Sequence, residues 1–217
     1  MANTGNIIIT ERDDNPDSPT YGQTRTRTIQ DTSYCQTGKN YKAKYTTSQK
    51  TGYIYCNGEE LLMASELPSS VITLEIGDCV TTIGEELFYY SSTLKTVTML
   101  NNVTTINDAA FNLCSELSSV TLSKGLDRIG NYAFAGDKKL KSIVIPESVS
   151  YIGMNAFRGC TALTSVTCLA TTPPSIGSDV FTNTNNCPIF VPAESVDTYK
   201  ATTYWNNYAS RIQPIQS

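Results

Sequence analysis

From residue 71 onward, apolar and polar positions repeat with a constant period, about 23 residues long, which lies in the range of known repeat architectures. The clearest marker is a series of evenly spaced phenylalanines, of which only the last is displaced by one position: Phe88, Phe111, Phe134, Phe157 and Phe181. Apolar residues recur with the same period at other positions of the repeat, and we call each such series a column. Further columns begin at Val71, Leu74, Ile76, Val80 and Ile83. Several columns that share one period indicate a repeat architecture rather than a chance pattern.

Each repeat unit predicts a short strand followed by a return turn. In Val97-Thr98-Met99 two apolar residues flank an outward threonine, which is strand periodicity. A second short stretch, 103–106, ends on the isoleucine column, and a glycine or asparagine follows, where we expect a tight or left-handed backbone. The segment 131–134 is expected to return the chain as a helical turn. Since one unit cannot bury its apolar face alone, residues 67–190 are predicted to form an α/β repeat solenoid with one continuous core.

The flanking segments differ from the repeats. Residues 1–22 are polar and contain prolines, so we expect a flexible tether. Residues 23–66 alternate threonine and tyrosine with other residues, which predicts a small β-rich segment and N-terminal cap. Residues 191–217 are predicted to form a C-terminal cap, in which residues 192–201 form a short helix.

Three aromatic residues of this C-terminal cap, Tyr204, Trp205 and Tyr208, have two interpretations. The favoured one is that they form the core of the cap and cover the last repeat with large apolar area. The alternative is that they form an aromatic patch on which a sugar stacks.

Composition narrows the range of functions. The 217 residues carry a formal net charge of −4, which disfavours a nucleic-acid partner. No apolar run is long enough to span a membrane. The chain has no histidine, which excludes Ser-His-Asp and Cys-His nucleophile pairs and histidine-ligated zinc. We therefore predict no catalytic, cofactor or metal site, and not an enzyme; an accessory or degenerate enzyme is the disfavoured alternative class.

The seven cysteines include no CxxC pair, and most are expected to be free buried thiols. Cys114 and Cys160 hold the same place in units two apart. Stacked strands would separate them by about 9–10 Å, beyond the roughly 7 Å that a disulfide spans. Both are therefore expected to be free, with Asp137 between them. Whether Cys35 and Cys56 pair is left open.

Outward positions of the predicted strands form a candidate binding face of small polar side chains. Its members, with two flanking lysines, are Glu75, Lys95, Thr98, Thr121, Lys141 and Thr167. Such a face suits hydrogen bonding to a glycan or contact with a protein. The alternative is that threonine and serine merely suit an exposed strand.

The unit from Leu140 to Cys160, LKSIVIPESVSYIGMNAFRGC, carries a more specific signal. It resembles the BspA-like leucine-rich repeats of Bacteroidetes surface proteins and of some protist proteins. The resemblance covers about residues 67–190, and the stretch from Ile189 onward is similar to the usual end of such proteins. It implies a solenoid that serves adhesion or ligand recognition rather than catalysis.

Two settings follow from this resemblance. The N-terminus lacks the basic start and apolar stretch of a secretory signal. We therefore expect a displayed virion protein, of fibre or decoration type, from a Bacteroides phage; it would bind a host surface or, through residues 1–60, other virion proteins. The alternative is a Bacteroidetes cell-surface adhesin whose export signal is missing from this chain. The expected partner is a protein or glycan on a bacterial surface, and the expected location is the virion or the cell exterior.

Overall fold

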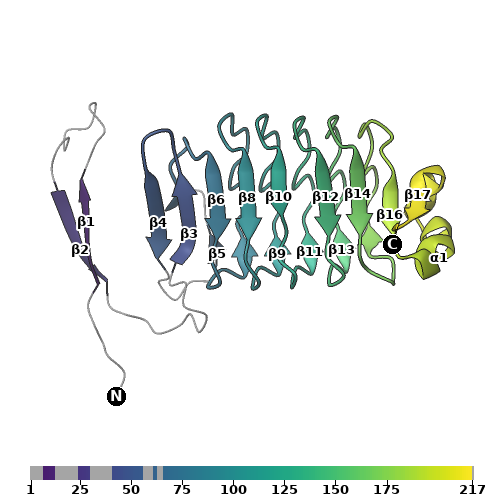
Figure 1. Ribbon diagram of the computed structural model, residues 1–217, viewed down its shortest axis with the longest axis horizontal. Helices are drawn as coiled ribbons and strands as arrows, with labels where there is room; N and C mark the ends of the chain where they lie inside the picture. Colours follow the sequence, from purple (N-terminus) through teal and green to yellow (C-terminus); the bar gives the residue numbers. More distant parts are fainter. Residues whose placement is uncertain (1–6, 13–23, 30–40, 56–60, 63–65, 217) are drawn as a thin grey trace, which may run out of the picture.

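The computed structural model describes residues 7–12, 24–29, 41–55, 61–62 and 66–216. Its dominant feature is a solenoid whose coils stack along one axis (Figure 1). Two ladders of parallel strands run along this axis. The first ladder contains β6 (Thr73–Ile76), β8 (Thr96–Met99) and β10 (Ser119–Thr121), then β12 (Ser142–Ile145), β14 (Ser165–Cys168) and β16 (Ile189–Val191). The second contains β5 (Leu61–Leu62), β7 (Thr82–Ile83), β9 (Thr105–Ile106), β11 (Arg128–Ile129), β13 (Tyr151–Ile152) and β15 (Ser175–Ile176). The predicted solenoid is confirmed.

Strand pairing reproduces the sequence period. Ile83 lies opposite Ile106, and Ile106 opposite Ile129, each one repeat period further along the chain. The longer last step of the repeats does not disturb the second ladder, because Ile152 still lies opposite Ile176. The extra residue is absorbed between β14 and β15.

The core is a stack of identical side chains. Phe111, Phe134, Phe157 and Phe181 are fully buried. Neighbouring rings from Phe88 to Phe181 lie 5.2–6.0 Å apart between centroids, with interplanar angles of 5–12°. Stacked aromatic rings add packing energy to the burial of their area. The prediction that the phenylalanine column stacks in line is confirmed.

The return segments are turns rather than the helical turns expected over residues 131–134. The Phe134 N–H donates to the Ala156 carbonyl of the next coil at 2.8 Å, so it is not available for a helical bond to the residue four before it. Tyr132 and Asn155 adopt φ angles of 55° and 58° in these turns. The glycine after the isoleucine column serves close approach instead, since a Cβ on Gly153 would lie 2.5 Å from the Asn131 nitrogen.

Antiparallel strands precede the solenoid. β3 (Tyr41–Thr46) and β4 (Thr51–Tyr55) form a hairpin, and β3 also pairs with β6. The hairpin therefore covers the free edge of the first ladder, as expected of an N-terminal cap. β1 (Ile7–Arg12) and β2 (Thr24–Ile29) pair with each other. Residues 7–12 thus form a strand inside the segment expected to be a tether, whose other residues lie outside the described ones.

The chain ends in a compact cap at the right of Figure 1. It contains the 3-10 helix η2 (Ala193–Ser195), the helix α1 (Val196–Ala201), the 3-10 helix η3 (Trp205–Arg211) and β17 (Ile212–Pro214). β17 pairs in parallel with β16 and so adds a last strand to the first ladder. The short helix expected over residues 192–201 is present.

Candidate functional site

Three residues of the predicted binding face lie side by side. Glu75 on β6 is in register with Thr98 on β8, and Thr98 with Thr121 on β10. Glu75 also accepts a hydrogen bond from the Tyr41 hydroxyl of the hairpin. Lys95 is exposed immediately before β8. We call these four residues, Glu75, Lys95, Thr98 and Thr121, the ladder face.

The other two predicted residues belong to a separate sheet. Among the described strands, no pairing joins β10 to β12, so the first ladder consists of two sheets. Lys141 is exposed before β12, and Thr167 on β14 is in register with Val144, whose side chain is 51% exposed. The six predicted residues are therefore divided between two sheets. The sequence spacing across the break equals the ordinary repeat period and gives no sign of it.

The aromatic residues of the C-terminal cap lie mostly in its interior. Trp205 is fully buried, and its indole N–H donates to the Pro174 carbonyl at 2.8 Å. Tyr208 is also buried, and its hydroxyl accepts from the Phe181 N–H at 3.2 Å. Both rings contact Phe181 and so continue the phenylalanine stack. Of the three residues predicted as a patch, Tyr204 alone presents its side chain to solvent.

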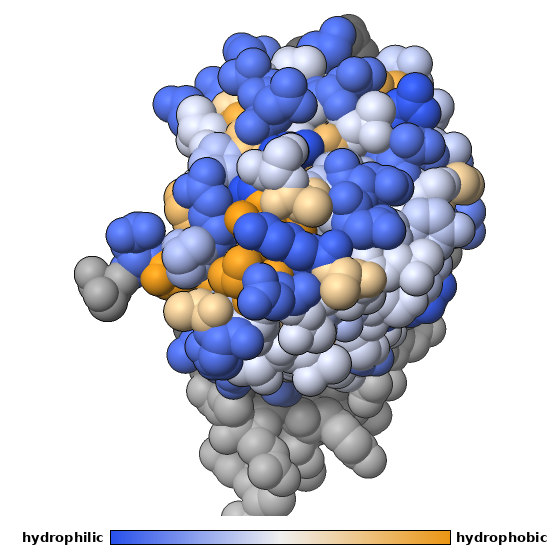
Figure 2. All heavy atoms as spheres, turned by 90° about the vertical axis from the view of Figure 1, so that its right-hand side faces the viewer, coloured by the Kyte–Doolittle hydropathy of each residue, from blue (hydrophilic) through white to orange (hydrophobic). Residues whose placement is uncertain are grey.

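Side chains of the cap also satisfy carbonyl groups of the last coils. The Ser195 and Tyr199 hydroxyls donate to the Thr171 and Ala170 carbonyls at 2.7 and 2.8 Å. The Arg211 guanidinium donates to the Cys187 and Phe181 carbonyls. Figure 2 shows this end of the molecule, where hydrophilic residues surround a small group of apolar ones. The last coil is thus closed by hydrogen bonds as well as by apolar packing.

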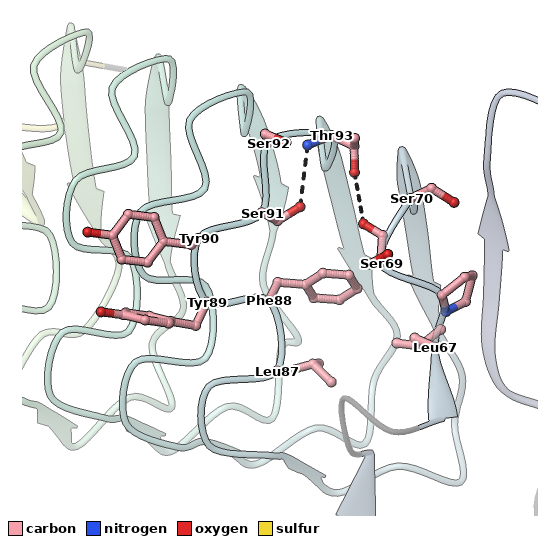
Figure 3. Close-up of a pocket in the computed structure, with 11 residues that line it drawn as sticks. Leu67, Ser69, Ser70, Leu87, Phe88, Tyr89, Tyr90, Ser91, Ser92 and Thr93 are labelled. Atoms are coloured by element: carbon pink, nitrogen blue, oxygen red, sulfur yellow. Dashed lines mark hydrogen bonds between the residues drawn. The ribbon is translucent and has the colours of Figure 1, made fainter.

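The N-terminal end of the solenoid has a pocket beside its first return turn. A pocket of about 460 Å³ lies between residues 67–70 and 87–93, and we call it the N-terminal pocket. Figure 3 shows the Phe88 ring pointing into it toward Leu67, whereas the Tyr89 and Tyr90 rings point the other way, over the following coils. None of the described residues that line it is charged.

The N-terminal pocket exists because the coil before β6 is short. Leu62 lies opposite Ile83, and this step is two positions shorter than the step from Thr73 to Thr96, which equals the repeat period. The stretch from Leu62 to Thr73 is therefore two residues shorter than its counterpart from Ile83 to Thr96, and Phe88 is 6% exposed whereas Phe111 is fully buried. The sequence interpretation missed this site. The available signal was Leu62, which continues the isoleucine column at the wrong spacing.

A column of buried polar groups runs through the solenoid interior. Asp137 is fully buried between Cys114 and Cys160; its Oδ1 accepts from the Cys114 N–H at 2.8 Å, and its Oδ2 finds no partner among the described residues. Burial raises the pKa of Asp137 well above its usual range. Burial and the neighbouring Asp137 also raise the pKa of both thiols, which keeps them protonated and unreactive.

The state of four cysteines agrees with the prediction of free buried thiols: Cys114, Cys160, Cys168 and Cys187. Cys79 is disulfide-bonded, and its partner lies outside the described residues, as do Cys35 and Cys56. Within the described ranges, no three histidine, cysteine, aspartate or glutamate side chains are grouped to hold a metal ion. No helix there has the length and apolar character needed to cross a membrane.

The repeats match a known family. The family model described as "BspA type leucine rich repeat region" matches residues 68–188 in six copies. The chain belongs to this family. BspA-type repeats form protein-interaction or adhesion modules, and leucine-rich repeats generally serve as binding scaffolds. No curated protein matches the chain.

Two solved structures share the fold. A leucine-rich cell-surface protein from Faecalibacterium prausnitzii A2-165 is 24% identical, with a TM-score of 0.55 over 79% of this chain and 41% of its own. A leucine-rich repeat protein from Eubacterium ventriosum is 20% identical, with a TM-score of 0.54 over 70% of this chain and 45% of its own. The chain thus spans less than half the length of these two relatives.

Proposed function

We propose that the chain is a non-enzymatic adhesion module displayed on a bacterial cell, and that its ladder face contacts a protein partner. The observation that carries the proposal is the in-register row of Glu75, Thr98 and Thr121 on hydrogen-bonded strands. The ladder holds these side chains at the strand spacing of about 4.8 Å. Because this backbone is already ordered, the chain itself loses little conformational entropy when a partner binds there.

The surrounding charges favour a protein as the partner. Glu75 and Lys95 place opposite charges on the ladder face, next to the neutral hydroxyls of Thr98 and Thr121. Mixed charge with small side chains suits a surface of matching charge pattern, which sets the orientation of a protein partner more than its affinity.

An extracellular setting is supported by the disulfide at Cys79. Disulfides persist on cell and virion surfaces and are rare in the cytosol. The F. prausnitzii relative is itself described as a cell-surface protein. A virion protein attached through residues 1–60 is the competing setting.

The ladder face is tested with Thr98→Arg and Thr121→Arg, which add a bulky charge. The matched control is Thr161→Arg, an exposed threonine whose column in the previous unit holds Lys138, so that a long cationic side chain fits there. Binding of the fluorescently labelled chain to bacterial and host cells is measured by flow cytometry. We expect at least a tenfold loss for the two ladder variants, none for the control, and loss after protease treatment of the cells. Equal binding by all variants would contradict the proposal.

The setting is tested in the organism that carries the gene. An antibody to the chain should label intact cells, and surface proteolysis should remove the label. Mass spectrometry of the unreduced native protein should find the Cys79 peptide linked to another peptide. Labelling confined to phage particles would support the virion setting instead.

A further inference from the structure

The return turns are joined by a second series of hydrogen bonds that stops at the N-terminal pocket. The Phe88 and Tyr90 N–H groups donate to the Ala110 and Asn112 carbonyls of the next coil, at 2.7 and 2.9 Å. The same pairing recurs in later coils, so each carbonyl of this series points toward the preceding coil. The equivalent carbonyls of the first full coil belong to Leu87 and Tyr89. Among the described residues, no donor reaches either of them.

In the described part of the preceding segment, the N–H groups of Leu67 and Ser69, the counterparts of Phe88 and Tyr90, make no bond to these carbonyls. Pro68 lacks an N–H, and the Leu67 side chain is shorter than the phenylalanine ring that each later coil supplies. The half-buried Leu67 side chain and the edge of the Phe88 ring, which is 6% exposed, both line the pocket (Figure 3). Two carbonyl acceptors thus border a cavity whose wall is apolar.

The rest of the lining adds neutral hydroxyl groups. Ser69, Ser70 and Ser92 are exposed, and their side chains make no hydrogen bond to the described residues. The Thr93 hydroxyl, by contrast, is used within the fold, since it donates to the Val71 carbonyl at 2.9 Å. The described lining therefore offers acceptors, adaptable hydroxyls and apolar side chains, and none of its residues carries a charge.

Exposed tyrosines adjoin the pocket at a cost in backbone strain. Tyr89 and Tyr90 are 46% and 65% exposed, and their rings pack edge to face with centroids 4.7 Å apart. Tyr90 has a φ of 60°, and two later coils place Gly136 and Gly159 at the same position. A left-handed conformation costs a non-glycine residue about 1–2 kcal/mol. Leu113, the equivalent residue of the next coil, has the same φ of 60°, so this conformation belongs to the return turns in general and does not itself mark a binding surface.

We propose that the N-terminal pocket binds a hexose unit of a neutral glycan. Sugar hydroxyls donate to the Leu87 and Tyr89 carbonyls, and the apolar face of the sugar ring lies against Leu67 and the small exposed edge of Phe88. The exposed tyrosines contact the next sugar unit of a longer chain. A volume of about 460 Å³ falls within the roughly 300–1,000 Å³ of small-ligand sites. This site is separate from the ladder face and goes beyond the adhesion proposed for that face.

The first experiment uses saturation-transfer NMR on the full chain. The probes are the methyl glycosides of glucose, galactose, mannose and N-acetylglucosamine, with sialic acid as a charged comparison. We expect at least one neutral sugar to receive saturation and sialic acid to receive none, because the pocket residues that the structure describes include no cation. Absence of any neutral binder, or binding of sialic acid alone, would overturn the proposal.

The second experiment fills the pocket. Leu67→Trp would place an aromatic ring beside Phe88 and extend the existing stack. We expect at least a tenfold weaker affinity for the sugar found above, without a lower melting temperature, so that unfolding cannot explain the loss. The matched control is Leu169→Trp, at an exposed leucine after β14. Unchanged sugar binding in Leu67→Trp would contradict the site.

The third experiment tests the direction of the hydrogen bonds. A fluorine that replaces a sugar hydroxyl accepts but does not donate, so replacing a hydroxyl that donates to Leu87 or Tyr89 should weaken binding about tenfold. If every fluorinated analogue binds as well as the parent sugar, the carbonyls are not the acceptors. Loss of sugar binding in Thr98→Arg but not in Leu67→Trp would move the sugar to the ladder face and leave the adhesion proposal standing.

Discussion

The two ends of the solenoid face the same physical problem and differ in how far they solve it. A stack of coils leaves backbone groups and apolar side chains open at each end. At the C-terminal end, Tyr208, Trp205 and Arg211 supply partners for the last coils, and the aromatic rings continue the stack beyond Phe181. At the N-terminal end, the β3–β4 hairpin covers the strand edge, but the edge of the return turns stays open at Leu87 and Tyr89.

The difference arises because the strand edge and the edge of the return turns are closed by different kinds of group. A strand edge is regular, so another strand pairs with it through backbone groups alone. The edge of the return turns is irregular, and at the C-terminal end it is satisfied by individually placed side chains. An open edge with apolar walls therefore suits ligand binding, whereas the filled edge stabilises the fold. Four sets of stability measurements test whether the two ends differ in this way, and they are given in order of decreasing expected effect.

Removing the aromatic anchor of the closed end should have the largest effect. Trp205→Ala deletes a fully buried ring and its hydrogen bond to Pro174, so we expect a loss of about 3–5 kcal/mol in the free energy of unfolding. Urea unfolding followed by circular dichroism measures it. Tyr204→Ala, at the exposed neighbour, should change stability by less than about 0.5 kcal/mol. Similar small changes in both variants would mean that the cap does not stabilise the solenoid.

The phenylalanine stack should be weaker at its open end than in its middle. Phe134→Ala removes a ring stacked on both sides, and we expect a loss of about 3–5 kcal/mol. Phe88→Ala removes a ring stacked on one side beside the pocket, so its loss should be smaller, at about 2 kcal/mol. The two variants are compared by urea unfolding at equal m-value. A larger loss for Phe88 would contradict the view that the N-terminal end is open.

In the interior, Asp137 Oδ2 has no hydrogen-bond partner among the described residues, and the carboxyl group of Asp137 titrates. Burial raises the pKa of Asp137, so the folded chain keeps a proton that the unfolded chain loses above about pH 4. Wild-type stability should therefore fall as the pH rises from about 4 toward the raised pKa. Asp137→Asn has no proton to lose and can donate from its amide, so we expect it to be more stable by about 1–3 kcal/mol at pH 7.

The measurement for Asp137 is thermal or urea unfolding of both proteins between pH 4 and 8. The advantage of Asp137→Asn should shrink at the acid end of this range, where wild-type Asp137 is protonated in both states. Asp137→Ala, which leaves the Cys114 N–H without its acceptor, serves as the comparison and should be destabilised. Parallel pH profiles for wild type and Asp137→Asn would show that Asp137 does not titrate as described.

The smallest expected effect is a gain in stability at the open end. Tyr90→Gly relieves the left-handed strain but adds freedom to the unfolded chain, so we expect a net gain of about 0.5 kcal/mol. Gly136→Ala at the equivalent position should lose stability, because φ is 76° and the added Cβ would lie 2.4 Å from Leu113 Cδ2. Melting temperatures measure both. A clear loss for Tyr90→Gly would mean that the tyrosine stabilises the fold.

The candidate sites could be predicted only in part. The alternation around Thr98 placed Glu75, Thr98 and Thr121 on one outward row, and the structure has them in register; their role in binding stays a prediction. The break between β10 and β12 was not predictable, because the spacing across it equals the ordinary repeat period. The N-terminal pocket was missed because Leu62 joins its column two positions out of step with the period used to find the repeats.

The sequence by itself determined the stack: a constant period repeats the same neighbours in every coil, so one apolar residue per column implies a continuous core. That argument needs only a residue and the equivalent residues in the coils before and after it. The first and the last coil have a neighbouring coil on one side only, and the repeat period does not predict which segment packs against the other side. Only the tertiary structure decided that Trp205 and Tyr208 are buried against Phe181, whereas Leu67 leaves Phe88 beside a pocket. The physical reason is that segments outside the repeat decide which end groups find a partner, and the contacts of those segments arise only on folding.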